Sequence, residues 1–507
     1  MKLCRLPFVL LFALGAASRL VADIALAPLF RDGAVLQRDR PIVVWGQAAA
    51  AEKVEVTFRR QTATVITRAD GRWQVTLKAE PASPVPSELT ASGANTVTVR
   101  DVLVGDVWLC SGQSNMAMLV RNSADAEREM AAARFPLIRH FKVPTTVAGT
   151  PATEVGGSWA SCSPETVGSF SAVAYYFARE LHQKNGVPIG LVNSSWGGTQ
   201  IEGWISEPAL RADPAWREIQ ARWEKTLADY PAAVQAHESQ LAKWTADEAA
   251  AKAAGKRFAR AKPRTPEGPG SRWLPAGIYN GMIAPLVPFG LRGVIWYQGE
   301  TNAARHAEYA SLFTALIKQW RADFGPDLPF YFVQLANFEA QTGNDGDTWA
   351  YLREAQARAL KLPATGMAVT IDIGEPKDIH PKNKQEVGRR LALHARRQVL
   401  GERIETDGPI FLSAKRDGAA MRVSFSHATG LKLEPAKDDG RVSFEIAGAD
   451  QKFVPAEARV DGQTLLVSAP SVTTPVAVRY AWRNSPDARL FNRAGLPAAP
   501  FRSDKWK

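Results

Sequence analysis

The sequence predicts an α/β protein, with a doubly wound domain and a mainly parallel sheet in the middle of the chain and an all-β domain on either side. Three observations predict it. Residues 23–101 are short alternating runs broken by turns, residues 102–402 alternate apolar runs with amphipathic stretches, and simple alternation returns in residues 403–507. The 507 residues, 46% of them hydrophobic, suffice for about three domains with separate cores.

The first 22 residues have the pattern of a cleaved secretory signal. Lys2 and Arg5 precede the apolar run Leu6–Ala17, and small residues continue to Ala22. This run is too short to span a bilayer comfortably, and an uncleaved anchor is the alternative reading. We therefore expect a secreted or periplasmic protein, with no membrane contact beyond export.

Residues 23–101 predict a β-sandwich, because short strand-like runs recur at a spacing of about 8–12 residues. The predicted strands are Pro41–Trp45, Lys53–Phe58, Thr62–Thr67 and Trp73–Leu77. The alternation after residue 403 predicts a second β-domain. Its runs are Arg422–Ser426, Val442–Ile446, Ala458–Val460, Thr464–Ser468 and Val476–Tyr480.

The apolar runs of the middle region are continuous, as expected for parallel strands that are covered on both faces. They are Val102–Cys110, Pro188–Asn193, Leu291–Trp296, Phe330–Leu335 and Met367–Ile371. Amphipathic stretches between and after them predict helices. These are Phe170–Lys184, His306–Phe324, Leu352–Leu362 and Gln385–Leu400. A helical insertion, at about 207–272, interrupts the alternation.

The net charge of +11 admits nucleic acid, membrane or an anionic substrate as partner. Loss of residues 1–22 removes three basic and no acidic residues, which lowers the charge by three to +8. Part of the surplus lies in one stretch of the insertion that we expect to be a solvated surface. Its basic residues are Lys252, Lys256, Arg257, Arg260, Lys262 and Arg264. No zinc-finger spacing or RNP-like motif is present, so we expect no nucleic-acid partner.

The two cysteines that follow the signal, Cys110 and Cys162, have two readings. In an oxidising compartment they would form a disulfide worth about 4 kcal/mol in the chain-entropy model. As buried thiols they would pack as small hydrophobic residues. Two cysteines do not make a zinc site, and neither H-E-x-x-H nor C-x-x-C occurs, so no metal is expected.

Polar turns with glycine follow three of the predicted strands, where a parallel sheet places its active site. They are Ser111–Met116, Asn193–Trp204 and Trp296–Asn302. Their glycines let the backbone approach a ligand closely and offer free N–H groups. Any one of the three could be a structural turn, but three in corresponding places indicate a binding site.

Ser114 is the candidate nucleophile. It follows Gly112 in a tight turn, where a hydroxyl can point over the sheet edge beside N–H groups that could stabilise an oxyanion. The pattern is not G-x-S-x-G, which disfavours an α/β-hydrolase elbow. Considered alone, Ser114 could equally be a helix cap.

His380 is the histidine we expect to act as base. It lies in the loop Asp372–Pro381, two residues after Asp378. A serine hydroxyl is a weak nucleophile until a base takes its proton, and a carboxylate that fixes the base's tautomer improves the base. The other six histidines lack such a context and are expected to pack or face solvent. They are His140, His182, His237, His306, His394 and His427.

Four ordered motifs together resemble the sialate O-acetylesterase family of SGNH-type carbohydrate esterases. They are Gly105–Met116, Trp196–Trp204, Trp296–Asn302 and Ile379–Pro381, and Asp32–Gly46 and Phe491–Asp504 also look like family segments. The resemblance thus covers nearly all of the chain after the signal. It implies a flavodoxin-like three-layer SGNH domain with β-sandwich-like domains on either side, and no cofactor.

The resemblance also implies roles. Ser114 would be the nucleophile and His380 its base, and the oxyanion would be stabilised by the N–H groups of Ser114 and Gly198 and by the side-chain amide of Gln298. Further candidates for oxyanion or substrate contacts are Gln113, Asn115 and Asn302.

The acid that orients His380 has two candidates. Many SGNH hydrolases have aspartate three residues before the histidine, but Lys377 stands there. Asp378, at two residues, is the natural substitute. Glu300 is the alternative, because in carbohydrate acetylesterases with a Gln-Gly-Glu motif this glutamate is a candidate for orienting the histidine.

We therefore expect a secreted carbohydrate esterase that removes O-acetyl groups, foremost from sialic acid, through an acetyl-serine enzyme. Acetylxylan or another plant glycan is the alternative substrate. A non-catalytic glycan-binding protein is the alternative of another class. Four tryptophans are either stacking surfaces for a sugar ring or core residues: Trp108, Trp196, Trp204 and Trp296.

Overall fold

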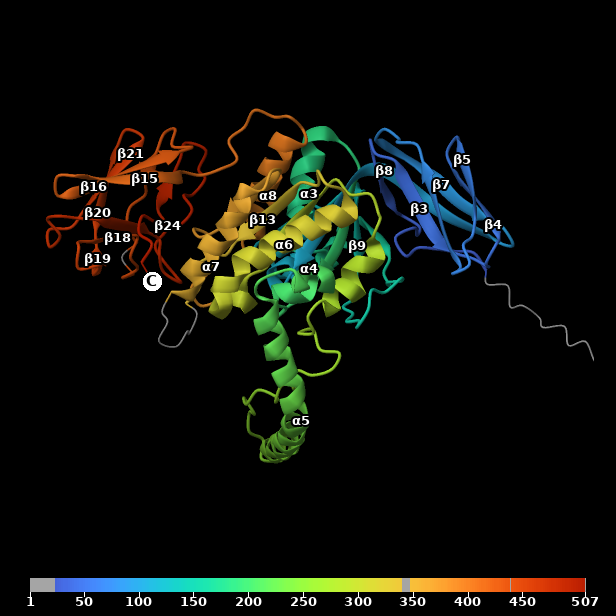
Figure 1. Cartoon of the computed structure of the whole chain (residues 1–507), viewed down its shortest axis with the longest axis horizontal. Helices are drawn as coiled ribbons and strands as arrows, with labels where there is room; N and C mark the ends of the chain where they lie inside the picture. Colours follow the sequence, from blue (N-terminus) through green and yellow to red (C-terminus); the bar gives the residue numbers. More distant parts are fainter. Residues whose placement is uncertain (1–22, 340–346, 438, 507) are drawn as a thin grey trace, which may run out of the picture.

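Three parts follow one another along the molecule, and one long helix projects from the middle part (Figure 1). The computed structural model describes residues 23–339, 347–437 and 439–506. The predicted signal peptide, residues 1–22, lies outside this range. Within the described residues, no helix combines the length and the apolar character that crossing a membrane requires.

The N-terminal part consists of antiparallel sheets, as its alternating sequence predicts. One sheet contains β1 (Ala25–Leu26), β3 (Ile42–Gln47) and β6 (Arg72–Leu77). Other strands of this part pair with one another and, through β7, with β8. They are β4 (Lys53–Phe58), β5 (Gln61–Ile66) and β7 (Ser83–Ser92), while β2 (Val35–Gln37) runs parallel to β8. Alternate side chains of β4 and β6 are buried, so one face of each strand makes the core.

The strand β8 (Thr96–Gly112) continues from this part into the central one. Its first half pairs with β7, and it then pairs in parallel with β11 from Asp106 and with β12 from Trp108. The backbone therefore has no break at the boundary between residues 101 and 102 that the change in sequence texture suggests. The strand carries the loop of Ser114 directly out of the N-terminal β-domain.

The central sheet has the order β10-β9-β11-β8-β12-β13-β14. Only β10 is antiparallel to its neighbour. The bounds are β9 (Phe135–Lys142), β10 (Trp159–Cys162), β11 (Ile189–Ser195), β12 (Gly293–Tyr297), β13 (Phe330–Gln334) and β14 (Thr365–Val369). Taken in chain order, β8, β11, β12, β13 and β14 are arranged 2-1-3-4-5. The order reverses beside β8, and a sheet of this kind binds its ligand at that point.

Helices pack on this sheet in two pairs: α3 (Ala172–Asn185) with α8 (Lys384–Gln398), and α6 (His306–Phe324) with α7 (Thr348–Ala357). Trp108 of β8 contacts Phe177 of α3 edge to face, and Trp296 of β12 contacts Trp320 of α6 in the same manner. These rings are fully buried. The predicted helices are present: α6 has the predicted bounds, and the ends of α3 and α8 differ by one or two residues. The predicted stretch Leu352–Leu362 covers the second half of α7 and a 3-10 helix, Arg358–Lys361.

The insertion is helical, as predicted. It begins with α4 (Glu207–Arg211), and α5 (Trp216–Ala253) then extends 38 residues away from the sheet (Figure 1). Along α5 only Ile219 is buried, because most of this helix has no neighbour to pack against.

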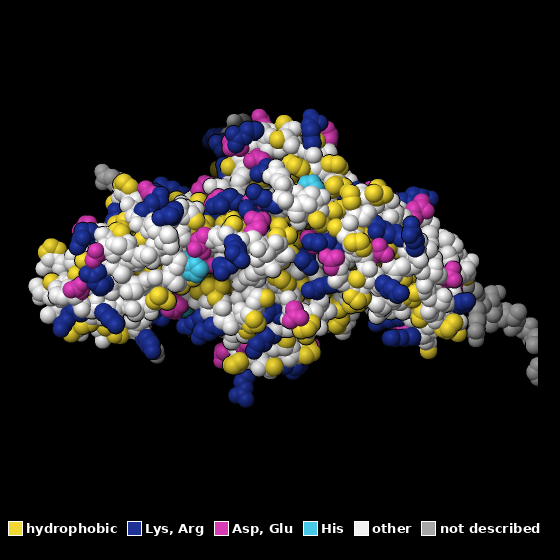
Figure 2. Space-filling model, turned by 90° about the horizontal axis from the view of Figure 1, so that it is seen from above, with side chains coloured by type: hydrophobic (Ala, Val, Ile, Leu, Met, Phe, Trp, Pro, Cys, Tyr) yellow, Lys and Arg dark blue, Asp and Glu magenta, His cyan; other side chains and the backbone are white. Residues whose placement is uncertain are grey.

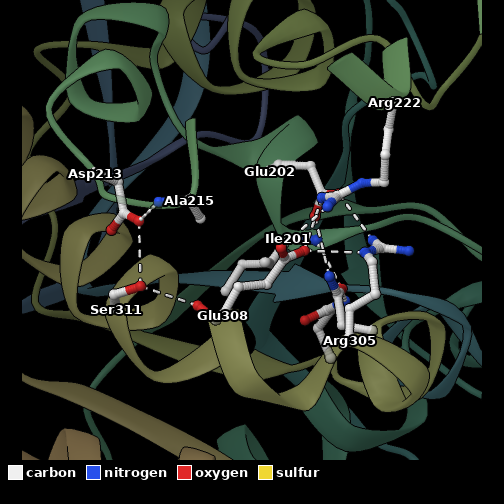
Figure 3. A network of polar contacts seen from close by, with 10 residues as sticks. Ile201, Glu202, Asp213, Ala215, Arg222, Arg305, Glu308 and Ser311 are labelled. Atoms are coloured by element: carbon white, nitrogen blue, oxygen red, sulfur yellow. Dashed lines mark hydrogen bonds and ion pairs between the residues drawn. The ribbon is translucent and has the colours of Figure 1, made fainter. Parts of the chain in front are cut away.

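Ion pairs fix the base of the insertion (Figure 3). Arg222 of α5 donates to Glu308 of α6 at 2.7 Å, and Arg305 donates to the buried Glu202 at 2.8 Å. Glu202 in turn accepts from Asn302 at 3.0 Å. The long helix is therefore attached to the loops that follow β11 and β12.

The C-terminal part contains antiparallel sheets. One has the order β15-β16-β21-β20, another β19-β18-β22-β24, and β17 pairs with β23. The longest strands are β15 (Ile410–Asp417), β16 (Ala420–Ser426), β20 (Glu457–Asp461) and β21 (Thr464–Ser468). The shorter ones are β17 (Lys432–Leu433), β18 (Phe444–Ala447), β19 (Phe453–Pro455), β22 (Ala477–Tyr480), β23 (Leu490–Phe491) and β24 (Phe501–Arg502).

Cys110 and Cys162 are both buried as free thiols. Burial raises the pKa of both, to about 12 for Cys162. They therefore match the second sequence reading, in which they pack as small hydrophobic side chains.

Arg353 of α7 joins the C-terminal part to the central domain. It is fully buried and donates to the carbonyl oxygens of Leu335 and Ala336 after β13, and to those of Arg483 and Asn484. Burial lowers its pKa to about 9.

Replacing Arg353 with Met should therefore lower the free energy of unfolding by about 3 kcal/mol, because buried carbonyls lose a charged donor. Urea unfolding followed by fluorescence measures this change. The exposed Arg358, whose ion pair with Glu354 is long at 3.4 Å, is the matched control. Arg358→Met should change the stability by less than about 0.5 kcal/mol, and equal effects of the two substitutions would contradict our reading.

Candidate active site

Gly112 brings the ends of β8 and β12 together. Its φ is +136°, and a Cβ at this position would lie 2.1 Å from the carbonyl oxygen of Tyr297. Only glycine fits so close an approach in this conformation. Gln113 then donates its N–H to Tyr297 O at 2.9 Å, and Ser114 opens the short helix α1 (Ser114–Ala117) at the sheet edge.

Ser114 and His380 meet although 266 residues separate them. Ser114 Oγ lies 2.8 Å from His380 Nε2, a hydrogen-bond distance. His380 comes from the loop between β14 and α8, so the two side chains arrive from the carboxyl ends of different parallel strands. The contact gives the serine hydroxyl a base that can take its proton.

The environment of His380 keeps it neutral. Partial burial lowers its pKa, the carboxylate of Asp378 works in the opposite direction, and the ammonium of Lys384 lowers the pKa further. A neutral imidazole at neutral pH can accept the proton of Ser114.

Asp378 makes a hydrogen bond to the backbone of His380 and none to its ring. Its Oδ1 accepts the backbone N–H of His380 at 2.8 Å, whereas the distance from Oδ1 to His380 Nδ1 is 3.9 Å. This second distance is too long for a hydrogen bond, so the carboxylate acts on the imidazole only through its charge.

Glu300, the other candidate orienter, contacts Asn115 and not the imidazole. Its Oε1 accepts from Asn115 Nδ2 at 2.5 Å, while its Oε2 is buried without a hydrogen-bond partner among the described residues. Burial raises the pKa of Glu300. Asp378 is therefore the acid nearer to the imidazole.

The loop after β11 lies against the nucleophile. A Cβ on Gly197 would be 3.2 Å from Ser114 Cβ, and Gly198 has a φ of +69°. The carbonyl of Gly198 accepts from Trp273 Nε1 at 3.1 Å, and the guanidinium of Arg272 lies beside the same glycine. The segment that returns from the insertion therefore forms part of the wall of the site.

The two amide hydrogens of Gln298 are already used inside the protein. Its Nε2 donates to Thr199 O at 3.1 Å and to Asn302 Oδ1 at 2.8 Å, and the residue is fully buried. These contacts do not fit the oxyanion role that the family resemblance implies for Gln298. They instead connect the loops after β11 and β12.

Asn302 and Gln113 also hold loops in place. Asn302 Oδ1 accepts the N–H of Ile201 at 2.9 Å, and Gln113 Oε1 accepts those of Gly299 and Thr301 at 3.3 and 3.4 Å. Both side chains are buried. The polar residues expected near the substrate thus serve largely to build the framework around Ser114.

Three of the four tryptophans singled out as possible stacking surfaces belong to the core. Trp108, Trp204 and Trp296 are fully buried, and only Trp196, beside Gly197, is partly exposed. An aromatic residue beside a glycine turn can either pack in the core or face the site. The sequence therefore did not distinguish a core tryptophan from one that stacks on a sugar ring.

Lys384 is a residue of this site that sequence reasoning missed. It is fully buried and donates to Asn115 Oδ1 at 2.6 Å. Lysine is normally exposed, and nothing in the Lys382-Asn383-Lys384 run distinguishes the second lysine from the first.

One group of side chains among the described residues could hold a metal ion. The ligand atoms of Glu405, Asp407 and His427 lie within 4.8 Å of one another. They belong to the beginning of the C-terminal part, and His427 already contacts Glu405 at 2.8 Å. These residues lie on other elements than those that carry Ser114 and His380.

Comparison with known proteins gives the family. The family model for the sialic acid-specific acetylesterases, which are carbohydrate esterases, matches residues 104–241 and 271–397. The chain belongs to this family. It is accordingly an esterase, a hydrolase of carboxylic esters. The match omits residues 242–270, which are the far end of α5 and the segment after it.

Relatives with assigned names agree over almost the whole chain. The sialate O-acetylesterase of Rattus norvegicus is 32% identical and covers 92% of both chains, and that of Homo sapiens is 30% identical over 92% of this chain and 90% of its own. Among solved structures, a carbohydrate acetylesterase from Xanthomonas citri is 41% identical, with a TM-score of 0.79 over 96% of this chain and 100% of that one. The fold and the ester chemistry are therefore shared.

The two candidate orienters of His380 should differ in activity when neutralised. Asp378→Asn should lower kcat/KM for p-nitrophenyl acetate about 100-fold, because a carboxylate that orients the base contributes up to roughly 10⁴-fold. The acidic limb of the pH profile should also move to lower pH, because Asp378 raises the pKa of His380.

Glu300→Gln keeps an acceptor for Asn115. It should therefore lower kcat/KM for p-nitrophenyl acetate by less than about tenfold. Steady-state kinetics from pH 4 to pH 9 measure both variants. A larger loss from Glu300→Gln than from Asp378→Asn would identify Glu300 as the orienter.

Proposed function

We propose that this protein is an exported serine esterase that removes O-acetyl groups from sugars, with sialic acid as the foremost substrate. The observation that carries the proposal is the 2.8 Å contact between Ser114 Oγ and His380 Nε2 beside the Gly197–Gly198 turn. A nucleophile, its base and a glycine-bearing N–H loop at one sheet edge are the parts that acyl transfer needs.

The first half of the reaction transfers the acetyl group to the enzyme. Ser114 Oγ attacks the acetyl carbonyl carbon while His380 Nε2 takes the hydroxyl proton. The negative charge that develops on the carbonyl oxygen is stabilised by the N–H groups of Ser114 and Gly198, neither of which has a partner among the described residues. His380 then gives its proton to the sugar oxygen as the bond to the acetyl carbon breaks.

The second half returns the enzyme to its starting state. His380 takes a proton from water, the hydroxide attacks the acetyl-Ser114 carbonyl, and the proton returns to Ser114 as acetate leaves. With Gln298 occupied elsewhere, the oxyanion depends on two backbone donors. Loss of one such donor typically costs about 2.7–4 kcal/mol in the barrier.

The names of the relatives favour sialic acid as substrate. The curated relatives are sialate O-acetylesterases, whereas the similar solved structure is named only a carbohydrate acetylesterase. An acetylated plant glycan therefore stays the alternative substrate. A non-catalytic glycan-binding role is disfavoured, because it would not require a serine and a histidine in hydrogen-bond contact.

The surface charge supports a sugar partner over nucleic acid. On the face in Figure 2, Lys and Arg side chains lie scattered among Asp and Glu without a single basic tract. In the insertion, Arg260 pairs with Asp247 at 2.8 Å, as expected for a solvated surface.

Export and the finer description of the fold also belong to this proposal. The charged and apolar pattern of residues 1–22 supports a cleaved signal. The 2-1-3-4-5 order of the five strands supports a flavodoxin-like SGNH domain. The sheets before and after it support β-sandwich-like flanking domains.

Ser114→Ala should lower p-nitrophenyl acetate hydrolysis by at least about 10³-fold, because it removes the hydroxyl that His380 contacts. The melting temperature should stay within about 2 °C, which differential scanning fluorimetry checks. Mass spectrometry of the wild type under rapid quench should show one acetyl group on Ser114. Activity retained by a folded Ser114→Ala variant would overturn the mechanism.

The substrate can be decided by acetate release. The wild type should act on 9-O-acetylated sialic acid with a kcat/KM at least about tenfold above that on acetylated xylan, a difference of about 1.4 kcal/mol in the barrier. An enzyme-coupled acetate assay measures both substrates under one set of conditions. The opposite preference would make the protein a plant-glycan esterase with the same chemistry.

A further inference from the structure

One side chain connects the nucleophile to the base from within the protein. Asn115, the residue after Ser114, donates through Nδ2 to the carbonyl of Ile379 at 2.9 Å, and Ile379 immediately precedes His380. The same Nδ2 donates to Glu300 Oε1 at 2.5 Å. All the polar atoms of this amide are thus used inside the protein, so Asn115 does not fit the substrate contact expected from the sequence.

The orientation of this amide is fixed by its neighbours. The ammonium of Lys384 can only donate, so the atom of Asn115 that faces it is the oxygen. The carbonyl of Ile379 and the carboxylate of Glu300 can only accept, so they face the nitrogen. The three neighbours therefore fix which way Asn115 points, and Lys384, through Asn115, is connected to the loop before His380.

Burying Lys384 as a cation at this position costs free energy. It is the first residue of α8, where the positive end of the helix dipole disfavours a cation, and it has no exposed surface. Its ammonium lies 5.3 Å from the centre of the Tyr297 ring, and Glu300, Asp378 and Glu375 are the acids near it. Because a buried charge needs compensation, Glu300 and Asn115 are its local partners.

We propose that Lys384 is a positioning residue of the esterase: through Asn115 it fixes the backbone of Ile379, and with it His380, relative to Ser114. The inference rests on the proposed Ser114–His380 mechanism. Glu300 then has a role in this mechanism without touching the imidazole, because it holds the other side of Asn115 and balances the ammonium.

The charge of Lys384 gives the proposal a second consequence. Burial lowers the pKa of Lys384 to about 7, with Glu300, Asp378 and Glu375 acting in the opposite direction. Below this pH the ammonium lowers the pKa of His380, on which burial and Asp378 also act. Removing the ammonium should therefore raise the pKa of His380 and move the acidic limb of activity to higher pH.

The experiment compares Lys384→Met with Lys382→Met, whose side chain is exposed two residues earlier. Lys384→Met should lower kcat for p-nitrophenyl acetate about 30-fold with KM within threefold, because a displaced base slows the chemistry more than binding. Its acidic limb should lie at higher pH than that of the wild type. Lys382→Met should match the wild type in kcat, KM and pH profile.

The double variant Lys384→Met/Glu300→Gln separates positioning from stability. Lys384→Met alone leaves Glu300 buried without its cation, whereas the double variant neutralises the pair and should regain most of the lost melting temperature. If Lys384 positions the base, the double variant should keep the low kcat of Lys384→Met, and the acidic limb of its pH profile should stay at higher pH than that of the wild type. Recovery of both kcat and the wild-type limb would show that Lys384 acts only on stability, and would overturn the proposal.

The lysine and serine variants distinguish a wrong role for Lys384 from a wrong role for Ser114. A folded Lys384→Met variant with wild-type kcat and limb would overturn the positioning role alone, while Ser114→Ala stayed inactive. If instead Ser114→Ala retained activity, the proposed mechanism itself would fail, whatever the lysine variants showed.

Discussion

The absence of a side chain at Gly112 is the constraint on which the site depends. Without a Cβ at this point, the ends of β8 and β12 come within hydrogen-bonding distance, and the loop of Ser114 lies directly beside the loop of Gly299 and Glu300. Any larger residue would collide with the carbonyl of Tyr297 and separate the strands. The contact of Ser114 with His380 then follows, because α1 starts at a fixed place over the sheet edge.

Buried polar networks do the rest of the positioning. Around Glu202, arginines and Asn302 connect the insertion to the loops after β11 and β12. Around Asn115, Lys384 and Glu300 lie where the loop of Ser114 meets the loop of His380. An unpaired polar group costs free energy inside a protein, so the groups that are paired in these networks favour one geometry, although Glu300 Oε2 has no partner among the described residues. The loops of the site are irregular, and these networks supply the rigidity that helices and strands supply elsewhere.

The strands and helices were predictable where the periodicity of neighbouring residues defines them. Continuous apolar runs became the parallel strands, and α6 has exactly its predicted bounds, because periodicity alone defines such elements. The residue types and the glycine turns also singled out Ser114 and His380, which the structure brings into contact, while their roles stay a prediction. The sequence did not predict which way amide and aromatic side chains point. The amides of Gln298 and Asn115 make hydrogen bonds inside the protein, and three of the tryptophans lie in the core, because neighbours far apart in the chain decide the orientation of a side chain.

The sequence by itself therefore determined the order of the elements, the family and the pair of residues that meet at the sheet edge. Strand periodicity and turn chemistry are local properties of the chain, and the four ordered motifs that resemble the family can be found by comparing sequences. Only the tertiary structure decided that Asp378 is nearer than Glu300 to the imidazole, that the cysteines are free thiols, and that a buried lysine contacts Asn115, the residue after Ser114. Each of these depends on burial and on contacts between residues far apart in the chain, and no local pattern encodes such contacts.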